Sequence, residues 1–356
     1  MKLWLRRIHL LLALISGLFL LILSLTGAVL IYANDIQYYF QPDKWQVSNK
    51  STVLNPSALI STVQAQTDSK IVRYMPQENV NAAWPVRLQD GTNANVNPYT
   101  GQVIYRYEST DTLYGFTLAL HRWLLLENDK GDKPLKNWVS ICALLLIINA
   151  LVGFYLWVKP KNRLKRLAIK PKAKFRVLMY QLHTVAGVYV LIPLILIAFT
   201  GMAFNWKNAT QLVLETAMFS QIEQRPKTPQ IEPQPGNSID YDSAINNALS
   251  VFPNGSLYRI YLPKKSTDPI ALRIQNLGES HAYSWVWVNP FTARVLDFYD
   301  ASKANFVTQT WNFKYKFHTG NFAGPIVNFL WLLIVFSLSF FIVSGFYFWA
   351  KRHKWM

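Results

Sequence analysis

The chain has 356 residues and a formal net charge of +17, with 51% apolar and 15% aromatic residues. This length and composition suit a membrane protein with several spans and folded regions outside the bilayer. A strongly basic chain can bind nucleic acid, but nearly all of the net positive charge comes from three short segments, residues 2–7, 159–176 and 351–354, which contain no Asp or Glu. We therefore exclude a nucleic-acid partner and attribute the charge to membrane topology.

Four apolar runs are long enough to cross a bilayer, which requires about 20 residues of helix. They are residues 8–32, 138–158, 177–206 and 325–350. The first run is too long for the apolar core of a secretory signal peptide and lacks a convincing cleavage site, so we predict an uncleaved anchor.

Each basic segment lies beside one or two of these runs, and the positive-inside rule places such segments in the cytoplasm. The sequence therefore predicts a multi-pass protein of a bacterial inner membrane, with both termini in the cytoplasm and two large segments facing outward. Residues 159–176 are expected to bind anionic lipids, and the alternative is docking of an acidic electron-donor protein. The lone Cys142 lies within the second run, so the outward segments fold without disulfides.

Two kinds of motif occur twice in the chain. Val-Asn-Pro-Tyr-Thr-Gly-Gln-Val at residues 96–103 recurs as Val-Asn-Pro-Phe-Thr-Ala-Arg-Val at residues 288–295. Gly-Phe-Tyr-x-Trp at residues 153–157 recurs at 345–349 with the same offset. Such self-similarity indicates an internal duplication of a unit made of a helix, an outward domain and a second helix.

Each outward segment shows a helical pattern followed by short strands. The predicted helices are residues 55–66 and 241–251, and the predicted strands are residues 72–74, 86–89, 258–262, 270–275 and 283–288. The Asn-Pro-aromatic-Thr motifs are typical of turns. The proline-rich residues 225–236 predict an extended linker, and alternating aromatic residues in 311–317 predict a further strand.

The fold class is thus an integral membrane α-helical four-helix bundle with two periplasmic α+β domains. The boundaries we predict are membrane helices in residues 1–32, 134–158, 177–206 and 325–350, periplasmic domains in 33–133 and 207–324, a basic cytoplasmic loop in 159–176 and a cytoplasmic tail in 351–356. The first domain is expected to end in a short interfacial helix.

The doubled layout, the Asn97-Pro98-Tyr99-Thr100-Gly101 stretch, the two histidines near helix starts and the Gly-Phe-Tyr-x-Trp helix ends resemble the PepSY-associated transmembrane helix family. The resemblance covers essentially the whole chain and implies that the two periplasmic domains are PepSY-like. Some members of this family are haem-containing ferric-siderophore reductases, and others are poorly characterised iron-regulated membrane proteins.

Four of the six histidines form two candidate pairs. His9 and His183 begin the first and third spans and are expected at one membrane depth near the cytoplasm. His121 and His318 precede the second and fourth spans and are expected at the outer side. His281 is predicted to be a surface residue, and His353 a residue of the basic tail and a replacement ligand near the first pair.

Ionisable side chains inside a bilayer are costly and are usually kept for a partner or a ligand. Two neutral imidazoles from different helices can fill both axial positions of a haem, which suits electron transfer. With the family resemblance, this predicts two haem b groups, one held by His9 and His183 and one by His121 and His318. Candidate partners of the haem propionates are Arg6 and Arg7 near His9, Arg122 beside His121, and Lys316 near His318. Gly17, Gly27, Gly187 and Gly201 either admit a porphyrin or serve helix packing.

The expected function is outward electron transfer that reduces a periplasmic ferric chelate, as the ferric-siderophore reductases of this family do. The sequence has no nucleotide-binding loop, cysteine pair or Gly-x-Ser-x-Gly motif. Electrons would therefore come from a quinol or a cytoplasmic reductase. Two alternatives remain, a non-enzymatic PepSY module that binds or regulates a peptide, and a cytochrome b-type subunit of a larger oxidoreductase.

Overall fold

The computed structural model describes residues 2–48, 52–234 and 238–352. The chain divides into two compact units. One comprises residues 1–33, 116–217 and 314–356, is almost entirely helical, and is called the helical unit below. The other comprises residues 34–115 and 218–313, contains all the described strands, and is called the sheet unit.

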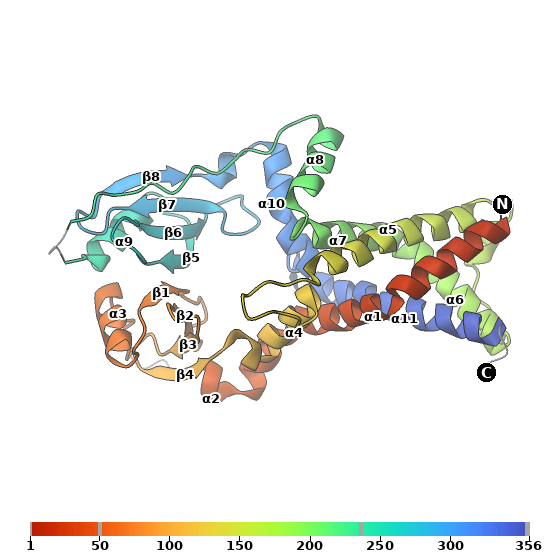
Figure 1. Ribbon diagram of the computed structural model, residues 1–356, viewed down its shortest axis with the longest axis horizontal. Helices are drawn as coiled ribbons and strands as arrows, with labels where there is room; N and C mark the ends of the chain where they lie inside the picture. The colour runs from red at the N-terminus through yellow and green to blue at the C-terminus, as the bar shows by residue number, and fades with distance from the viewer. Residues whose placement is uncertain (1, 49–51, 235–237, 353–356) are drawn as a thin grey trace. The chain divides into compact units, whose positions relative to one another are not determined.

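Long apolar helices run side by side in the helical unit (Figure 1). The principal helices are α1 (Lys2–Phe40), α5 (Lys136–Val158), α6 (Phe175–Tyr189), α7 (Leu191–Ala203) and α11 (Gly324–Arg352). Shorter ones are α4 (Leu113–Trp123), α8 (Lys207–Met218), α10 (Phe306–Thr319) and η2 (Leu164–Leu167). The beginning of α1 and the end of α11 lie at the same end of this unit (Figure 1).

Three described helices, α1, α5 and α11, are long and apolar enough to cross a membrane, and they contain three of the four predicted spans. The remaining span, residues 177–206, differs from the prediction. It forms two helices, α6 and α7, bent by 65° at Val190, and they make a fourth span if the pair is counted as one. Pro193 explains the break, because proline has no N–H to donate to the carbonyl of Tyr189 and is tolerated only in the first turn of a helix.

The sheet unit is built around one antiparallel sheet of eight strands, with the order β4-β3-β2-β1-β5-β6-β7-β8. The strands of the first half are β1 (Ile71–Tyr74), β2 (Trp84–Leu88), β3 (Asn93–Val96) and β4 (Val103–Tyr107). Those of the second half are β5 (Ser256–Tyr261), β6 (Ile270–Gln275), β7 (Ser284–Val288) and β8 (Val295–Tyr299). The remaining elements are α2 (Pro42–Trp45), α3 (Pro56–Ala65), α9 (Tyr241–Leu249), η1 (Ser109–Asp111) and η3 (Ala301–Lys303).

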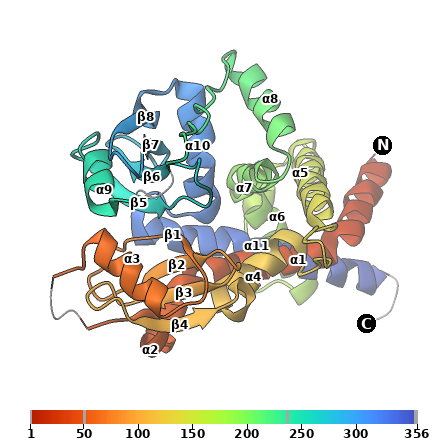
Figure 2. The same cartoon turned by 60° about the vertical axis from the view of Figure 1, so that its left-hand side comes forward.

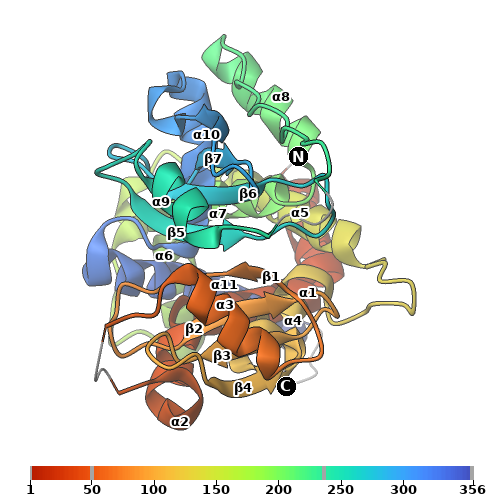
Figure 3. The same ribbon diagram turned by 90° about the vertical axis from the view of Figure 1, so that its left-hand side faces the viewer.

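The two halves of the sheet share one hydrophobic core. Helices α3 and α9 cover the same face of the sheet (Figure 3), and their side chains pack with those of all eight strands, such as Val63, Ala248 and Ile260. Strands β1 and β5 join the halves, with Tyr74 paired to Ile260. The prediction of two separate domains is therefore not confirmed, because the strands from both segments complete a single sheet.

The two Asn-Pro motifs form the same turn. Asn97 and Asn289 each accept a hydrogen bond from the backbone N–H two residues later, and each also receives one from the fifth motif residue through its carbonyl. That fifth residue has positive φ in both turns, +73° at Gly101 and +56° at Ala293. The turn prediction is confirmed, and the absence of glycine in the second motif does not change the turn.

The expected strand at residues 311–317 is wrong, since these residues belong to the helix α10. The side chain of Asn305 accepts a hydrogen bond from the N–H of Thr308 at the start of this helix. Val307 and Trp311 are both buried and are four residues apart, which places them on one helical face. The alternation of aromatic residues in 311–317 therefore does not reflect a strand.

We predict that Ile260→Ala destabilises the whole sheet by about 2–5 kcal/mol, because Ile260 is 1% exposed at the junction of the two halves. Hydrogen exchange of the purified protein should show faster exchange in β2 and β3 as well as in β6 and β7. Leu277→Ala, at a side chain that is 70% exposed, is the control and should change neither half. Faster exchange restricted to β5–β8 would contradict a single cooperative sheet.

Candidate functional site

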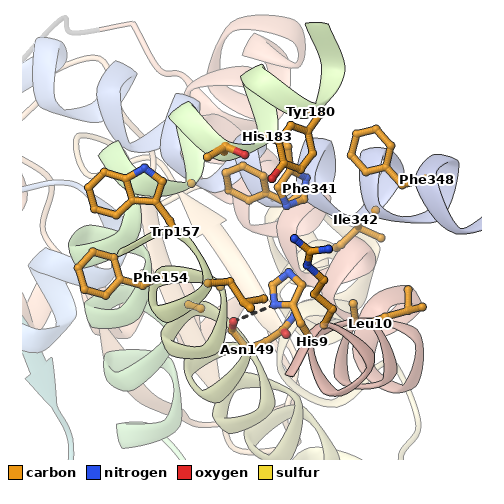
Figure 4. Close-up of a pocket in the computed structure, with 18 of the residues that line it drawn as sticks. His9, Leu10, Asn149, Phe154, Trp157, Tyr180, His183, Phe341, Ile342 and Phe348 are labelled. Atoms are coloured by element: carbon orange, nitrogen blue, oxygen red, sulfur yellow. Dashed lines mark hydrogen bonds between the residues drawn. The ribbon is translucent and has the colours of Figure 1, made fainter. Parts of the chain in front are cut away.

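A cavity of about 810 Å³ lies in the helical unit, between the ends of α1, α5, α6 and α11. The side chains of His9 from α1 and His183 from α6 both reach it (Figure 4). Much of the lining is apolar or aromatic, and Phe341 and Ile342 of α11 close one side (Figure 4). The structure thus brings together the first pair of histidines predicted from the sequence. A volume of this size suits a cofactor, since ligand pockets measure roughly 300–1,000 Å³.

A backbone carbonyl fixes the tautomer of His9. Its Nδ1 lies 3.1 Å from the carbonyl oxygen of Asn149 on α5. A carbonyl oxygen only accepts, so Nδ1 carries the proton and Nε2 keeps its lone pair. One turn further along α5, a Cβ added at Gly153 would lie 3.1 Å from His9 Cε1, so glycine leaves the space that the ring needs.

A serine on α11 fixes the tautomer of His183 in the same sense. His183 Nδ1 lies 2.7 Å from Ser344 Oγ, and that hydroxyl donates its proton to the carbonyl of Phe340 at 2.7 Å. Ser344 therefore accepts from His183 Nδ1–H, which leaves Nε2 of His183 without a proton. The ring of Phe341 packs edge-on against the imidazole, with 5.1 Å between the ring centroids.

The second pair, His121 of α4 and His318 of α10, is also brought together within the helical unit. The two ring centroids are 6.2 Å apart and the ring planes are inclined by 59°. Burial lowers the pKa of both imidazoles, and the nearby His318 lowers that of His121 further. Both side chains are therefore neutral at neutral pH without a ligand.

A Thr-Gly dipeptide holds each member of this second pair. Thr26 Oγ1 lies 2.9 Å from His121 Nδ1 and donates its own proton to the carbonyl of Ile22 at 2.6 Å. A Cβ added at Gly27 would lie 3.3 Å from His121 Cε1. His121 therefore has its proton on Nδ1 and its lone pair on Nε2.

The equivalent dipeptide, Thr200-Gly201, holds His318. Its Nδ1 lies 3.0 Å from the carbonyl of Ile197 and 3.1 Å from Thr200 Oγ1. The Thr200 hydroxyl donates to the carbonyl of Leu196 at 2.8 Å, and a Cβ added at Gly201 would lie 3.1 Å from His318 Cε1. The repeated Thr-Gly motifs, one within α1 and one near the end of α7, thus act as matching supports for the second histidine pair.

The arginines at the first pair agree only in part with those expected. Of the two near His9, Arg6 lines the cavity, whereas Arg7 is exposed and is not part of the lining. Arg166, Arg176 and Arg352 also line it. The guanidinium of Arg166 donates to the hydroxyl of Tyr180 at 2.5 Å and so is oriented by a second lining residue. At the second pair, Arg122 adjoins His121 in sequence, but its side chain is exposed and lies against Trp123, at 5.9 Å from the ring centroid.

The other predicted residues are placed as follows. His281 is half-buried in the sheet unit between Tyr258 and Tyr283. His353 lies outside the described residues. Gly17 and Gly187 line the cavity beside the first pair, whereas Gly27 and Gly201 support the second pair. In the described ranges, His, Cys, Asp and Glu form no cluster of three or more that could hold a metal ion.

Sequence reasoning missed the groups that orient the histidines. Asn149, Thr26, Thr200 and Ser344 bond to the Nδ1 atoms, but a lone hydroxyl or amide residue in an apolar helix gives no individual signal. The two Thr-Gly repeats were a usable signal, because each follows a histidine at the same spacing in both halves.

Apolar helices long enough to cross a bilayer, together with a folded sheet unit, define a membrane protein. The chain matches the model of the PepSY-associated TM region over residues 6–352, nearly its whole length. It therefore belongs to this family, and the resemblance inferred from its motifs is confirmed. The comparison with curated proteins finds no match.

We predict that, in protein free of bound metal, His9, His121, His183 and His318 all carry their ring proton on Nδ1. Nitrogen NMR of histidine-labelled protein distinguishes a protonated ring nitrogen from a bare one, and single His→Gln variants assign the signals. His281, in a different environment, serves as the reference. A protonated Nε2 at any of the four would contradict the hydrogen-bond assignment.

Proposed function

We propose that the protein is a di-haem electron-transfer protein, with one haem b held by His9 and His183 and a second by His121 and His318. The observation that carries this proposal is that all four imidazoles have the same protonation state. Each directs its Nδ1–H to a neighbouring helix and keeps a bare Nε2, which is the state of a histidine that ligates a metal. A histidine used only for packing has no reason to repeat this arrangement four times.

The cavity at the first pair supports the proposal in size and chemistry. Asn149 Oδ1 and Trp157 Nε1 line it and are buried without a hydrogen-bond partner in the described part of the chain. Buried polar atoms without a partner are rare, so they favour an occupant that the protein is built to hold. Arg6, Arg166, Arg176 and Arg352 offer cationic partners for the two carboxylates of a haem.

The spacing of the second pair is compatible with one metal ion between the rings. Metal–imidazole bonds of about 2.0–2.1 Å on opposite sides of an ion place two imidazole centroids roughly 6 Å apart. The observed separation is 6.2 Å. The exposed Arg122 beside His121 remains a candidate partner for a propionate at this site.

When bound, haem would supply one-electron redox chemistry at each pair. If both imidazoles of a pair held the haem, it would be suited to electron transfer rather than to oxygen activation. The chain's contribution is to fix the two pairs in one rigid helical frame. His9 and Thr26 both lie on α1 and are 17 residues apart, so the two pairs are separated by about 25 Å along the helix.

The proposed direction is outward across a bacterial inner membrane. The basic segments beside the first pair would face the cytoplasm and bind anionic lipids, and the sheet unit would lie in the periplasm. A quinol or a cytoplasmic reductase would donate electrons at the first pair, and a ferric chelate such as a ferric siderophore would accept them. Ferrous iron binds hard oxygen ligands less well than ferric iron, so reduction would release the metal.

An absorption spectrum of the purified protein tests the haem content. We expect a Soret band and two haems per chain, with about one haem lost in each of the single variants His9→Ala, His183→Ala, His121→Ala and His318→Ala. His281→Ala is the control and should keep both. A protein without a Soret band after haem supplementation would contradict the proposal and leave peptide binding by the sheet unit as the better function.

The serine behind His183 provides a second test. Ser344→Ala removes the acceptor of His183 Nδ1–H, and loss of such a supporting bond typically lowers metal affinity by about 10–100-fold. We expect haem at the first pair to dissociate correspondingly more readily, as measured by transfer to apomyoglobin, while the second pair is unaffected. Ser337→Ala, on the same helix with a hydroxyl bonded to its own backbone at Ile334, is the matched control. Equal transfer rates from the two variants would exclude this role for Ser344.

A further inference from the structure

The face of the sheet opposite α3 and α9 carries arginines and aromatic rings instead of an apolar core. Side chains alternate between the two faces of a strand, so residues paired directly across neighbouring strands share a face. One such row runs through Arg87, Arg73, Tyr261, Ala271 and Trp287. A second row runs through Arg259, Arg273, Trp285 and Tyr299. We call the surface formed by Arg73, Arg87, Arg259, Arg273, Tyr261 and Trp285 the arginine face.

Like charges are directly opposed on the arginine face. Arg73 is the cross-strand partner of Arg87, and Arg259 is that of Arg273. Such pairs destabilise a sheet when nothing neutralises them. The proximity of Arg259 and Arg87, in addition to burial, lowers the pKa of Arg73. The repulsion between these arginines therefore destabilises the sheet, and a bound anion would remove this destabilisation.

No described Asp or Glu forms an ion pair with these four arginines. Their hydrogen bonds go to neutral groups, such as those from Arg87 to Asn93 and Ser109 and from Arg259 to Tyr261. Nε of Arg259 is buried and has no partner in the described ranges. Asp297, on the edge strand β8, continues the first row because it is the cross-strand partner of Trp287. Two strands, β6 and β7, separate it from Tyr261. The positive charge in the middle of the sheet is uncompensated.

Aromatic rings form a stack beside these charges. The rings of Tyr261 and Trp285 are stacked with centroids 5.5 Å apart, and those of Trp285 and Trp287 at 6.0 Å. Arg225, from the extended segment before α9, lies over the Trp285 ring at 4.3 Å and is itself exposed. The face thus offers flat rings and guanidinium planes side by side. Tyr261, Trp285 and the strand arginines are half-buried, whereas Trp287 is fully buried and only extends the stack.

The positive electrostatic potential of this face affects the phenol of Tyr261. Burial raises the pKa of Tyr261, but the hydrogen bond from Arg259 and the charges of Arg259 and Arg273 outweigh it, so that the pKa of this phenol is lowered overall. A neighbouring aromatic hydroxyl is therefore stabilised in its anionic form. The same field would favour the ionised ring oxygens of a bound ligand.

We propose that the arginine face binds an anionic metal chelate built from aromatic rings, of the catecholate class, and discriminates against neutral chelates such as trihydroxamates. The uncompensated guanidiniums recognise the negative charge, and the stack of Tyr261 and Trp285, with Arg225 above it, recognises the rings. This inference deepens the proposed function, on which it rests, by naming the chemical class of the electron acceptor. The strands that carry this face, β2, β1, β5, β6 and β7, are neighbours in the sheet and are labelled in Figure 2.

Binding can be tested without any electron transfer by using gallium(III), which takes the place of ferric iron and is not reduced. Equilibrium dialysis of the full-length protein would compare the anionic gallium tris-catecholate complex, the neutral gallium trihydroxamate complex and anionic gallium citrate, which lacks rings. We expect the tris-catecholate to bind at least tenfold more tightly than either of the others. Equal binding of the catecholate and trihydroxamate complexes would overturn the proposal.

Variants locate the site. Arg225→Gln and Arg259→Gln should each weaken catecholate binding by about tenfold, as expected for loss of a charged hydrogen-bonding group, and Arg225→Lys should recover only part of the loss because it keeps charge without a stacking plane. Arg106→Gln, whose charge is already paired with Asp90 at 2.5 Å, is the control and should bind normally. Because Arg225 is exposed outside the strands, its variants remain informative if Arg259→Gln fails to fold. Unchanged binding in Arg225→Gln and in any folded Arg259→Gln would refute the assignment.

Competition with lipid vesicles and the Soret spectrum complete the test. Vesicles of phosphatidylglycerol should not displace the chelate, whereas displacement by these vesicles but not by phosphatidylcholine would identify the face as a lipid-headgroup site and overturn the inference. The Soret spectrum of the same samples should be identical for wild type and arginine variants. Loss of chelate binding with intact haem would thus leave the electron-transfer proposal standing, while absent haem with intact chelate binding would remove only the electron-transfer role.

Discussion

The hydrogen bond from histidine Nδ1–H to an acceptor on another helix is the interaction on which the helical unit depends. It occurs four times, to the carbonyl of Asn149, to Ser344, to Thr26 and to the carbonyl and hydroxyl at Ile197 and Thr200. Each bond ties two helices together and leaves one bare nitrogen per ring. The same contacts therefore join the helices and leave paired imidazoles with a bare nitrogen, so helix packing and the proposed ligand binding are compatible roles for these residues.

The sheet unit is stabilised by the joining of its two segments into one core. Neither segment that contributes to it builds an independent domain, because four short strands and one helix bury little apolar surface. Joining β1 to β5 gives one core with helices on one face. The opposite face buries Trp287 but leaves its arginines half-buried and outside that core. This position allows like-charged arginines to face one another beside stacked rings, an arrangement that stability alone would not favour.

The apolar runs, the helices α3 and α9 and five of the strands were predictable, because hydrophobic period and turn residues are local signals. The pairing of His9 with His183 followed from their equal positions in two halves. The failures had different causes. The joining of the strands into one sheet is non-local, because it depends on β1–β5 pairing across distant segments. The bend at Val190 depends on a single proline within an apolar run, and the choice between Arg6 and Arg7 depends on which of two neighbours the helix turns toward the cavity.

Electron paramagnetic resonance of the oxidised protein, with chemical quantification of haem on the same sample, tests the central claim most directly. Two low-spin ferric signals of bis-imidazole type, at two haems per chain, are the expected result, because in the proposed account the four Nε2 atoms would act as two pairs of ligands. A high-spin signal from the native protein, or one haem per chain at saturation, would contradict the account, since one pair would then lack the ligation that its hydrogen bonds prepare.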